Sequence, residues 1–206
     1  MPTFLARSAR GPSGPAVVVI QEWWGLNAQI EGVARRVAES GFAALAPDLY
    51  RGRQTDEPDE ARKLAMALDH ARALEDLQAA IGWLFDRGVS GVGAIGFCMG
   101  GGLTWELARS DERLGAAIPF YGGVDLPEGG PVLVPFQAHY GTEDRYPEEM
   151  LEAIELHRAD APGSELHRYA GVGHGFMNEE HEEDFDPKAA ELGWERALAY
   201  LRATLG

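Results

Sequence analysis

The chain has 206 residues, of which 45% are hydrophobic, so it is long enough to form one domain with a substantial core. Its 18 basic and 33 acidic residues give a formal net charge of -15, which disfavours nucleic acids and anionic membranes as partners. Residues 1–10 lack an apolar leader segment, and no apolar run reaches the roughly twenty residues that span a bilayer, so we expect a cytoplasmic protein.

The first half of the chain alternates predicted strands with predicted helices. Residues 16–21, Ala-Val-Val-Val-Ile-Gln, are nearly all apolar and predict a strand buried on both faces. Residues 30–38 repeat apolar side chains at helical spacing, up to a C-cap at Gly41. The other elements predicted here are an edge strand at 3–6, a turn at 11–15, a strand at 42–46, a surface loop at 48–58, helices near 59–69 and 71–86, and a strand at 91–97.

The second half continues this alternation. A helix follows residue 98, a turn is predicted at 126–131, and strands are predicted at 116–121, 132–140 and 165–169. Pro147 suits the first turn of a helix, and Asp186 and Pro187 predict the start of a last helix that runs to Leu205. We therefore expect a single-domain α/β fold over residues 1–206, with a mostly parallel central sheet and helices on both faces.

Residues 94–102, Ala-Ile-Gly-Phe-Cys-Met-Gly-Gly-Gly, predict a nucleophile elbow that carries a cysteine. Glycines are needed at Gly96 and Gly100 because side chains there would collide. The helix behind Cys98 directs its amides at the sulfur, which favours a thiolate, and the Met99 amide can face a developing oxyanion. The alternative is an inert buried cysteine in a Gly-rich turn. Because Cys98 is the only cysteine, no internal disulfide is possible, and a reducing compartment is expected.

An acid and a histidine follow the elbow at the ends of later strands, where functional groups gather in open α/β sheets. Asp144 follows one predicted strand in Gly-Thr-Glu-Asp, and His174 follows the next in Gly-Val-Gly-His-Gly-Phe. The order nucleophile, acid, histidine predicts a triad in which Cys98 attacks a carbonyl carbon, His174 takes or holds the thiol proton and Asp144 holds the imidazole tautomer. Glu143 is an alternative acid that sequence spacing does not reject.

The other five histidines are assigned to packing or to the surface. His70 and His157 fall within helical patterns, and His139 and His167 lie inside predicted strands. His181 follows a run of glutamates and has no strand behind it. None of the five is therefore predicted to take part in catalysis.

No metal and no cofactor are predicted. His174, Glu179, Glu180 and His181 are close in sequence, but they lack the His-Glu-x-x-His spacing, and there is no cysteine pair. A Gly-x-Gly-x-x-Gly motif after the first strand and a Walker loop are both missing from the sequence, so no nucleotide is indicated.

Glu22 ends the buried strand at 16–21 and is a fourth candidate for the site. A carboxylate there is costly unless it is hydrogen-bonded or functional. The same turn offers the Trp23 amide as a second oxyanion donor. The alternative role for Glu22 is to anchor its loop.

Together, these residues resemble the dienelactone hydrolase family of α/β-hydrolases, and the resemblance runs through nearly the whole chain. It implies an α/β-hydrolase fold, a triad of Cys98, Asp144 and His174, and an oxyanion hole formed by the amides of Trp23 and Met99. The segments that carry it are Gln-Glu-Trp-Trp-Gly at 21–25, Ala-Pro-Asp-Leu-Tyr at 46–50, Gly-Phe-Cys-Met-Gly-Gly at 96–101, Tyr-Gly at 121–122, Gly-Thr-Glu-Asp at 141–144 and Gly-His-Gly-Phe at 173–176.

The resemblance also implies hydrolysis of an enol-lactone such as 4-carboxymethylenebut-2-en-4-olide to maleylacetate, with Glu22 contacting the resting thiol and helping to convert it to a thiolate. The family enzyme that acts on dienelactone carries an arginine shortly after its histidine, whereas this chain offers only Asn178 there. Arg62 lies near the right place to substitute for it. The candidate substrate-binding residues are therefore Trp24, Arg62, Tyr121 and Asn178.

The primary hypothesis is a hydrolase of a small carboxylic ester or lactone that acts through a cysteine nucleophile and a covalent acyl-enzyme, as a monomer or a small homo-oligomer. The alternative is a non-catalytic thiol sensor or ligand-binding protein on the same fold, because an exposed thiolate is also what oxidants attack. An assay of p-nitrophenyl esters with a Cys98→Ala control separates the two.

Overall fold

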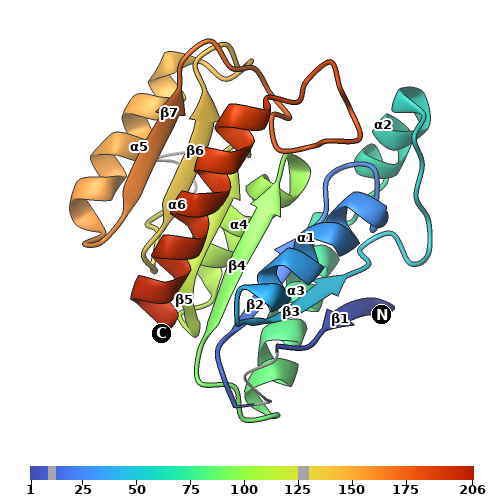
Figure 1. Cartoon of the computed structure of the whole chain (residues 1–206), viewed down its shortest axis with the longest axis vertical. Helices are drawn as coiled ribbons and strands as arrows, with labels where there is room; N and C mark the ends of the chain where they lie inside the picture. The colour runs from blue at the N-terminus through green and yellow to red at the C-terminus, as the bar shows by residue number, and fades with distance from the viewer. Residues whose placement is uncertain (9–12, 125–129) are drawn as a thin grey trace.

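The described strands join in one seven-stranded sheet (Figure 1). The structure is a computed structural model that describes residues 1–8, 13–124 and 130–206. Its strands are β1 Thr3–Ala6, β2 Ala16–Ile20, β3 Ala43–Pro47, β4 Val92–Phe97, β5 Leu114–Phe120, β6 Gln137–Gly141 and β7 Glu165–Tyr169. Their order is β1-β3-β2-β4-β5-β6-β7, and only β1 runs antiparallel to its neighbour. The mostly parallel sheet predicted from the sequence is confirmed.

Helices cover both faces of the sheet (Figure 1). The helices α1 Ala28–Glu39 and α6 Pro187–Leu205 pack on one face; α3 His70–Phe85, α4 Met99–Ser110 and α5 Glu148–Asp160 pack on the other; α2 Pro58–Met66 precedes α3. The side chains of β2 are buried on both sides: Val17 and Val19 contact the layer of α1 and α6, while Val18 and Ile20 contact the opposite layer. Burial on both faces explains why this strand reads as a continuous apolar run.

Side-chain caps begin helices α1 and α6, and the cap of α6 lies where the sequence predicts. The Asp186 carboxylate accepts hydrogen bonds from the amides of Lys188 and Ala189, at 3.0 and 2.8 Å, at the beginning of α6. Asn27 caps α1 through the amide of Ile30 at 3.2 Å. The start of the last helix at residues 186–187 is thus confirmed.

The strand predicted at 132–140 begins later than expected, at Gln137. The amide of Leu133 donates to a carbonyl in the last turn of α4, and Pro135 has no amide to donate. The Pro135 carbonyl accepts from Ala117 of β5 at 3.0 Å, so the segment meets β5 only through an isolated bridge. Val134 and Phe136 are buried in this segment without forming a strand, so burial alone does not make the run part of β6. The turns expected at 11–15 and 126–131 fall partly outside the described residues.

The carboxyl ends of the parallel strands meet at one edge of the sheet, and the segments that follow β2, β4, β6 and β7 gather there (Figure 1). Residues 170–186, drawn in orange and red, arch over this edge between β7 and α6. In the described part of the chain, no helix is long and apolar enough to cross a membrane.

Candidate active site

Cys98 lies on a sharp turn between the end of β4 and the first residue of α4. Its backbone has a φ of 52°, a value that costs a non-glycine residue about 1–3 kcal/mol. A Cβ on Gly96 would lie 2.1 Å from the carbonyl oxygen of Gly100, and a Cβ on Gly100 would lie 2.5 Å from that of Gln21. The two glycines of the motif are therefore required by close backbone packing beneath the strained cysteine.

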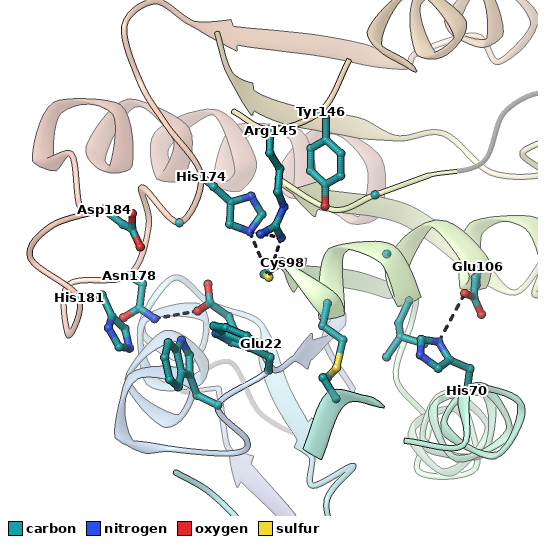
Figure 2. Close-up of a pocket in the computed structure, with 18 residues that line it drawn as sticks. Glu22, His70, Cys98, Glu106, Arg145, Tyr146, His174, Asn178, His181 and Asp184 are labelled. Carbon is teal, nitrogen blue, oxygen red and sulfur yellow. Dashed lines mark hydrogen bonds and ion pairs between the residues drawn. The ribbon is translucent and has the colours of Figure 1, made fainter. Parts of the chain in front are cut away.

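His174 lies next to this cysteine (Figure 2), and Asp144 contacts the other side of the His174 ring. The Nε2 atom of His174 lies 3.1 Å from the Sγ atom of Cys98. The Nδ1 atom of the same ring lies 3.0 and 3.2 Å from the two carboxylate oxygens of Asp144. These distances allow the imidazole to exchange a proton with the sulfur while the carboxylate holds the ring.

The loop after β6 brings Asp144 to His174 and turns Glu143 away. The hydroxyl of Thr142 accepts from the amide of Gly171 at 2.9 Å, and the Glu143 amide donates to a carbonyl two residues before His174 at 2.9 Å. The Asp144 carboxylate is only 3% exposed, whereas the Glu143 side chain is exposed to solvent. Of the two acids that the sequence leaves open, the geometry favours Asp144.

The environment of His174 favours its protonated form. Burial lowers the pKa of His174, but the hydrogen bonds to Asp144 and Cys98 outweigh burial and raise that pKa from 6.5 to about 9. An imidazole with a raised pKa keeps its proton through neutral pH and loses it as the pH rises past about 9. The ring can therefore hold the thiol proton until a leaving group takes it.

Glu22 is buried beside the pocket, with 4% of the residue exposed. One carboxylate oxygen accepts from the Tyr121 hydroxyl and the other from the Asn178 amide group, each at 2.8 Å. Burial raises the pKa of Glu22, and the bonds from Asn178 and Tyr121 oppose that effect. The family resemblance implies that Glu22 contacts the resting thiol, but the described side chains do not form this contact. Both oxygens of Glu22 accept from other partners, and the Cys98 sulfur contacts His174.

Glu22→Gln is expected to remove a pH-dependent loss of stability. Burial raises the folded-state pKa of Glu22 above 4.5, so the folded chain holds a proton there that the unfolded chain releases. The stabilising effect of that proton is complete below 4.5 and is lost as the pH rises toward the folded-state pKa. Between these two pH values, the free energy of unfolding of the wild type should fall, relative to that of the variant, by at most about 1.4 kcal/mol per pH unit.

Urea unfolding of both proteins, from about pH 4 to about pH 7, measures this difference. Glu143→Gln, which changes an exposed glutamate, is the matched control. If the wild type and Glu22→Gln show parallel stability curves, burial does not perturb this carboxyl group.

The two predicted oxyanion donors belong to residues at the ends of neighbouring elements of the sheet edge. Trp23 follows Glu22 after the carboxyl end of β2, and Met99 is the first residue of α4, where a backbone amide has no acceptor within its own helix. Both residues line the pocket around Cys98. Their contact with an oxyanion stays a prediction.

A pocket of about 520 Å³ opens on Cys98 and extends to both sides of it (Figure 2). Asn178, His181 and Asp184 lie on one side, and His70 and Glu106 lie on the other. Trp23 and Trp24 add aromatic surface to the pocket, and Leu103 adds aliphatic surface. A small organic substrate would meet ionisable groups on both sides of the sulfur.

The candidate substrate-binding residues occupy different positions. Trp24 lines the pocket and stacks on His181, with ring centroids 4.2 Å apart. Asn178 also lines the pocket, but its amide group is bound to Glu22. Tyr121 is fully buried and holds Glu22 from behind, so it positions that carboxylate rather than contacting the pocket.

Arg62 lies away from the pocket, contrary to the expectation from the sequence. Helix α2 buries Ala61 and Leu64, and Arg62 points from the opposite side of the helix. Its side chain is 65% exposed and lies 3.6 Å from Asp59. Arg62 is therefore not in a position to replace the family's substrate-binding arginine.

Arg145 and Tyr146 line the pocket and were missed by the sequence analysis. The Nη2 atom of Arg145 lies 3.0 Å from the Nε2 atom of His174 and 3.8 Å from the Sγ atom of Cys98 (Figure 2). Arg145 is neither an acid nor a histidine, so the triad pattern gives it no role. The available signal was its position, because a basic residue directly follows the proposed acid in a strongly acidic chain.

Two histidines assigned to packing or to the surface also line the pocket. His70, the first residue of α3, lies 3.9 Å from Glu106, and His181 stacks on Trp24. His139, in contrast, is fully buried within β6, as a packing histidine should be. Among the described residues, no group of three His, Cys, Asp or Glu side chains is arranged to hold a metal ion.

Comparisons with known proteins agree on one family. The model of the dienelactone hydrolase family matches residues 1–205. A protein of Aquifex aeolicus provisionally named carboxymethylenebutenolidase is 31% identical over 207 residues, covering 94% of this chain and 90% of that protein. A provisionally named dienelactone hydrolase of Klebsiella pneumoniae is 28% identical, with a TM-score of 0.85 over 98% of this chain and 92% of its own. A dienelactone hydrolase-like promiscuous phosphotriesterase from metagenomic libraries is 27% identical, with a TM-score of 0.82 over 93% and 87% of the two chains.

Proposed function

The chain belongs to the dienelactone hydrolase family, and we propose that it hydrolyses a small carboxylic ester or enol-lactone through Cys98, His174 and Asp144. The observation that carries this proposal is the continuous chain of contacts from Sγ through the imidazole to the carboxylate, at 3.1 and 3.0 Å, with Cys98 and His174 lining a pocket of about 520 Å³. A thiol sensor needs an accessible sulfur but has no use for a general base with its own orienting acid.

In the acylation step, the S–H bond of Cys98 breaks and Nε2 of His174 takes the proton, while the sulfur attacks the substrate carbonyl carbon and the carbonyl electron pair moves onto oxygen. The amides of Trp23 and Met99 donate to that oxyanion. When the tetrahedral species collapses, the carbon–oxygen bond to the leaving group breaks and His174 gives its proton to the departing oxygen. The product is a thioester on Cys98.

Water completes the reaction. The now neutral imidazole of His174 takes a proton from a water molecule, which attacks the thioester carbonyl through a second oxyanion. Collapse of that species breaks the carbon–sulfur bond, releases the carboxylic acid and leaves the electron pair on the sulfur of Cys98, which takes back the proton held by His174. Asp144 keeps the imidazole in one tautomer throughout, because Nδ1 donates to its carboxylate.

The acyl-enzyme is tested by partitioning between water and an added nucleophile. Two esters with the same acyl group, p-nitrophenyl butyrate and phenyl butyrate, form the same thioester, so with hydroxylamine present they are expected to give one ratio of hydroxamate to acid. A ratio that changes with the leaving group would mean that water attacks the substrate directly. If neither these esters nor a panel of enol-lactones turns over, the protein is not a hydrolase of this kind.

A further inference from the structure

One side of the pocket follows a single face of helix α4. Met99, Leu103 and Glu106 recur at the spacing that places helical side chains on one face, and all three line the pocket. Cys98 directly precedes this helix, so the space beside these residues begins at the sulfur and runs along α4. Figure 2 shows Glu106 and His70 away from the sulfur on this side. We call the part of the pocket lined by these four residues, His70, Met99, Leu103 and Glu106, the α4 arm.

The α4 arm changes from apolar to acidic along its length. Leu103 is buried, whereas the side chain of Glu106 is 42% exposed. The Nδ1 atom of His70 lies 3.9 Å from the Glu106 carboxylate, and a histidine is a cation only while it is protonated. Within the described part of the chain, Glu106 forms no ion pair with an arginine or a lysine. The carboxylate is therefore open to a cationic ligand.

The direction of the reaction assigns the acyl group to the α4 arm. His174 gives its proton to the departing oxygen, so the leaving group must lie beside the imidazole. The residues that follow His174 in the chain, Asn178, His181 and Asp184, line the opposite side of the pocket (Figure 2). A leaving group therefore extends toward these residues, and the acyl group held on the Cys98 sulfur extends along α4.

We propose that Glu106 is a substrate-binding residue that selects acyl groups ending in a cationic ammonium group. The inference rests on the proposed function in taking Cys98 as the nucleophile, and it names the class of acyl group that this site prefers. Helical rise separates the backbones of residues 99 and 106 by roughly 10 Å, and helical side chains lean toward the N-terminus. The carboxylate of Glu106 thus lies closer to the sulfur than its backbone does, within the reach of a hexanoyl chain that carries the cation at its end.

The other charged groups of the pocket do not provide the same selection. The guanidinium of Arg145 lies 3.8 Å from the Cys98 sulfur, at the reacting end of a bound acyl group. Glu22 is buried, and both of its carboxylate oxygens accept hydrogen bonds from other side chains. Asp184 lies on the side assigned to the leaving group (Figure 2). Glu106 is thus the acid that the far end of an acyl group meets.

Three p-nitrophenyl esters that differ only at the end of the acyl chain test this proposal. They are the 6-(trimethylammonio)hexanoate, its neutral isostere 7,7-dimethyloctanoate and the anionic 6-carboxyhexanoate. Wild-type protein should prefer the cationic ester, and Glu106→Gln should lower the ratio of kcat/KM for the cationic ester to that for the neutral one by about fivefold. Glu106→Lys should reverse the preference toward the anionic ester. Glu152→Gln removes an exposed glutamate of α5 outside the pocket and should keep the wild-type ratio, which controls for the net charge of -15.

A second pair of reagents separates this proposal from the proposed function. Chloroacetamides with a 6-(trimethylammonio)hexyl or a 7,7-dimethyloctyl group on nitrogen alkylate Cys98 without any ester hydrolysis. If no ester is turned over but Glu106→Gln lowers the ratio of the two alkylation rates, the cation site stands and the hydrolase proposal fails. If the esters are hydrolysed and Glu106→Gln leaves both ratios at their wild-type values, the cation site is overturned and the hydrolase proposal stands.

Discussion

Cys98→Ala is expected to lower kcat for p-nitrophenyl ester hydrolysis by about 10⁴-fold or more, to the level of the oxyanion hole and binding alone. Alanine has no atom that can attack the carbonyl carbon, so no thioester forms. His174 could still activate water, but it would act without a positioned nucleophile. The loss should therefore be close to that of removing the whole triad.

The fold should survive this substitution. Cys98 is only partly buried, and alanine at φ 52° has the same backbone strain as cysteine. Circular dichroism and the thermal midpoint of the variant should match those of the wild type. A folded Cys98→Ala protein with wild-type turnover would exclude the cysteine mechanism and leave the fold assignment untouched.

The elbow could be predicted from the sequence because its requirements are local. Gly96 and Gly100 are close in the chain to Cys98, and the spacing of these three residues marks the motif, although the backbone that Gly100 approaches, at Ile20 and Gln21, is distant in the sequence. The alternation of apolar runs likewise predicts the parallel sheet, since buried strands such as β2 show their burial in composition alone. A prediction of this kind needs no knowledge of distant contacts.

The differences between the sequence-based predictions and the structure depend on contacts between distant segments. Whether residues 132–136 join the sheet is decided by α4 and by Pro135, which lacks an amide. The orientation of Glu22 is decided by Tyr121 and Asn178, which lie 99 and 156 residues further along the chain. Composition and spacing carry no information about these partners, so the contact of Glu22 could not be derived from them.

The choice between two adjacent acids is a third such case. Glu143 and Asp144 occupy consecutive positions of one loop, and both suit a triad by residue type. Their difference arises only when the loop is pinned to the residues before His174, which leaves one carboxylate buried and the other in solvent. A pair of matched amide substitutions can therefore test the site with almost no change in volume.

Asp144→Asn is expected to lower kcat by about 10⁴-fold, whereas Glu143→Gln should leave it within about twofold of the wild type. An asparagine can present its amide N–H to Nδ1 of His174, and the ring then adopts the tautomer with its proton on Nε2. That tautomer has no lone pair facing Cys98 and cannot accept the thiol proton. The imidazolium also loses the carboxylate that raises its pKa, since the hydrogen bond from Nδ1 to Asp144 is the larger of the two side-chain bonds that do so.

The pH profile of kcat distinguishes this cause from a folding defect. In the wild type, the bonds to Asp144 and Cys98 raise the pKa of His174 to about 9. With the Asp144 carboxylate removed, the part of the pH profile that reports His174 should move to lower pH. A misfolded fraction would lower the whole profile without moving it. Equal losses in Asp144→Asn and Glu143→Gln would mean that neither carboxylate alone orients the imidazole. Because Glu143 is exposed and has no contact with the ring in the described structure, that result would require the loop after β6 to adopt a different conformation during turnover.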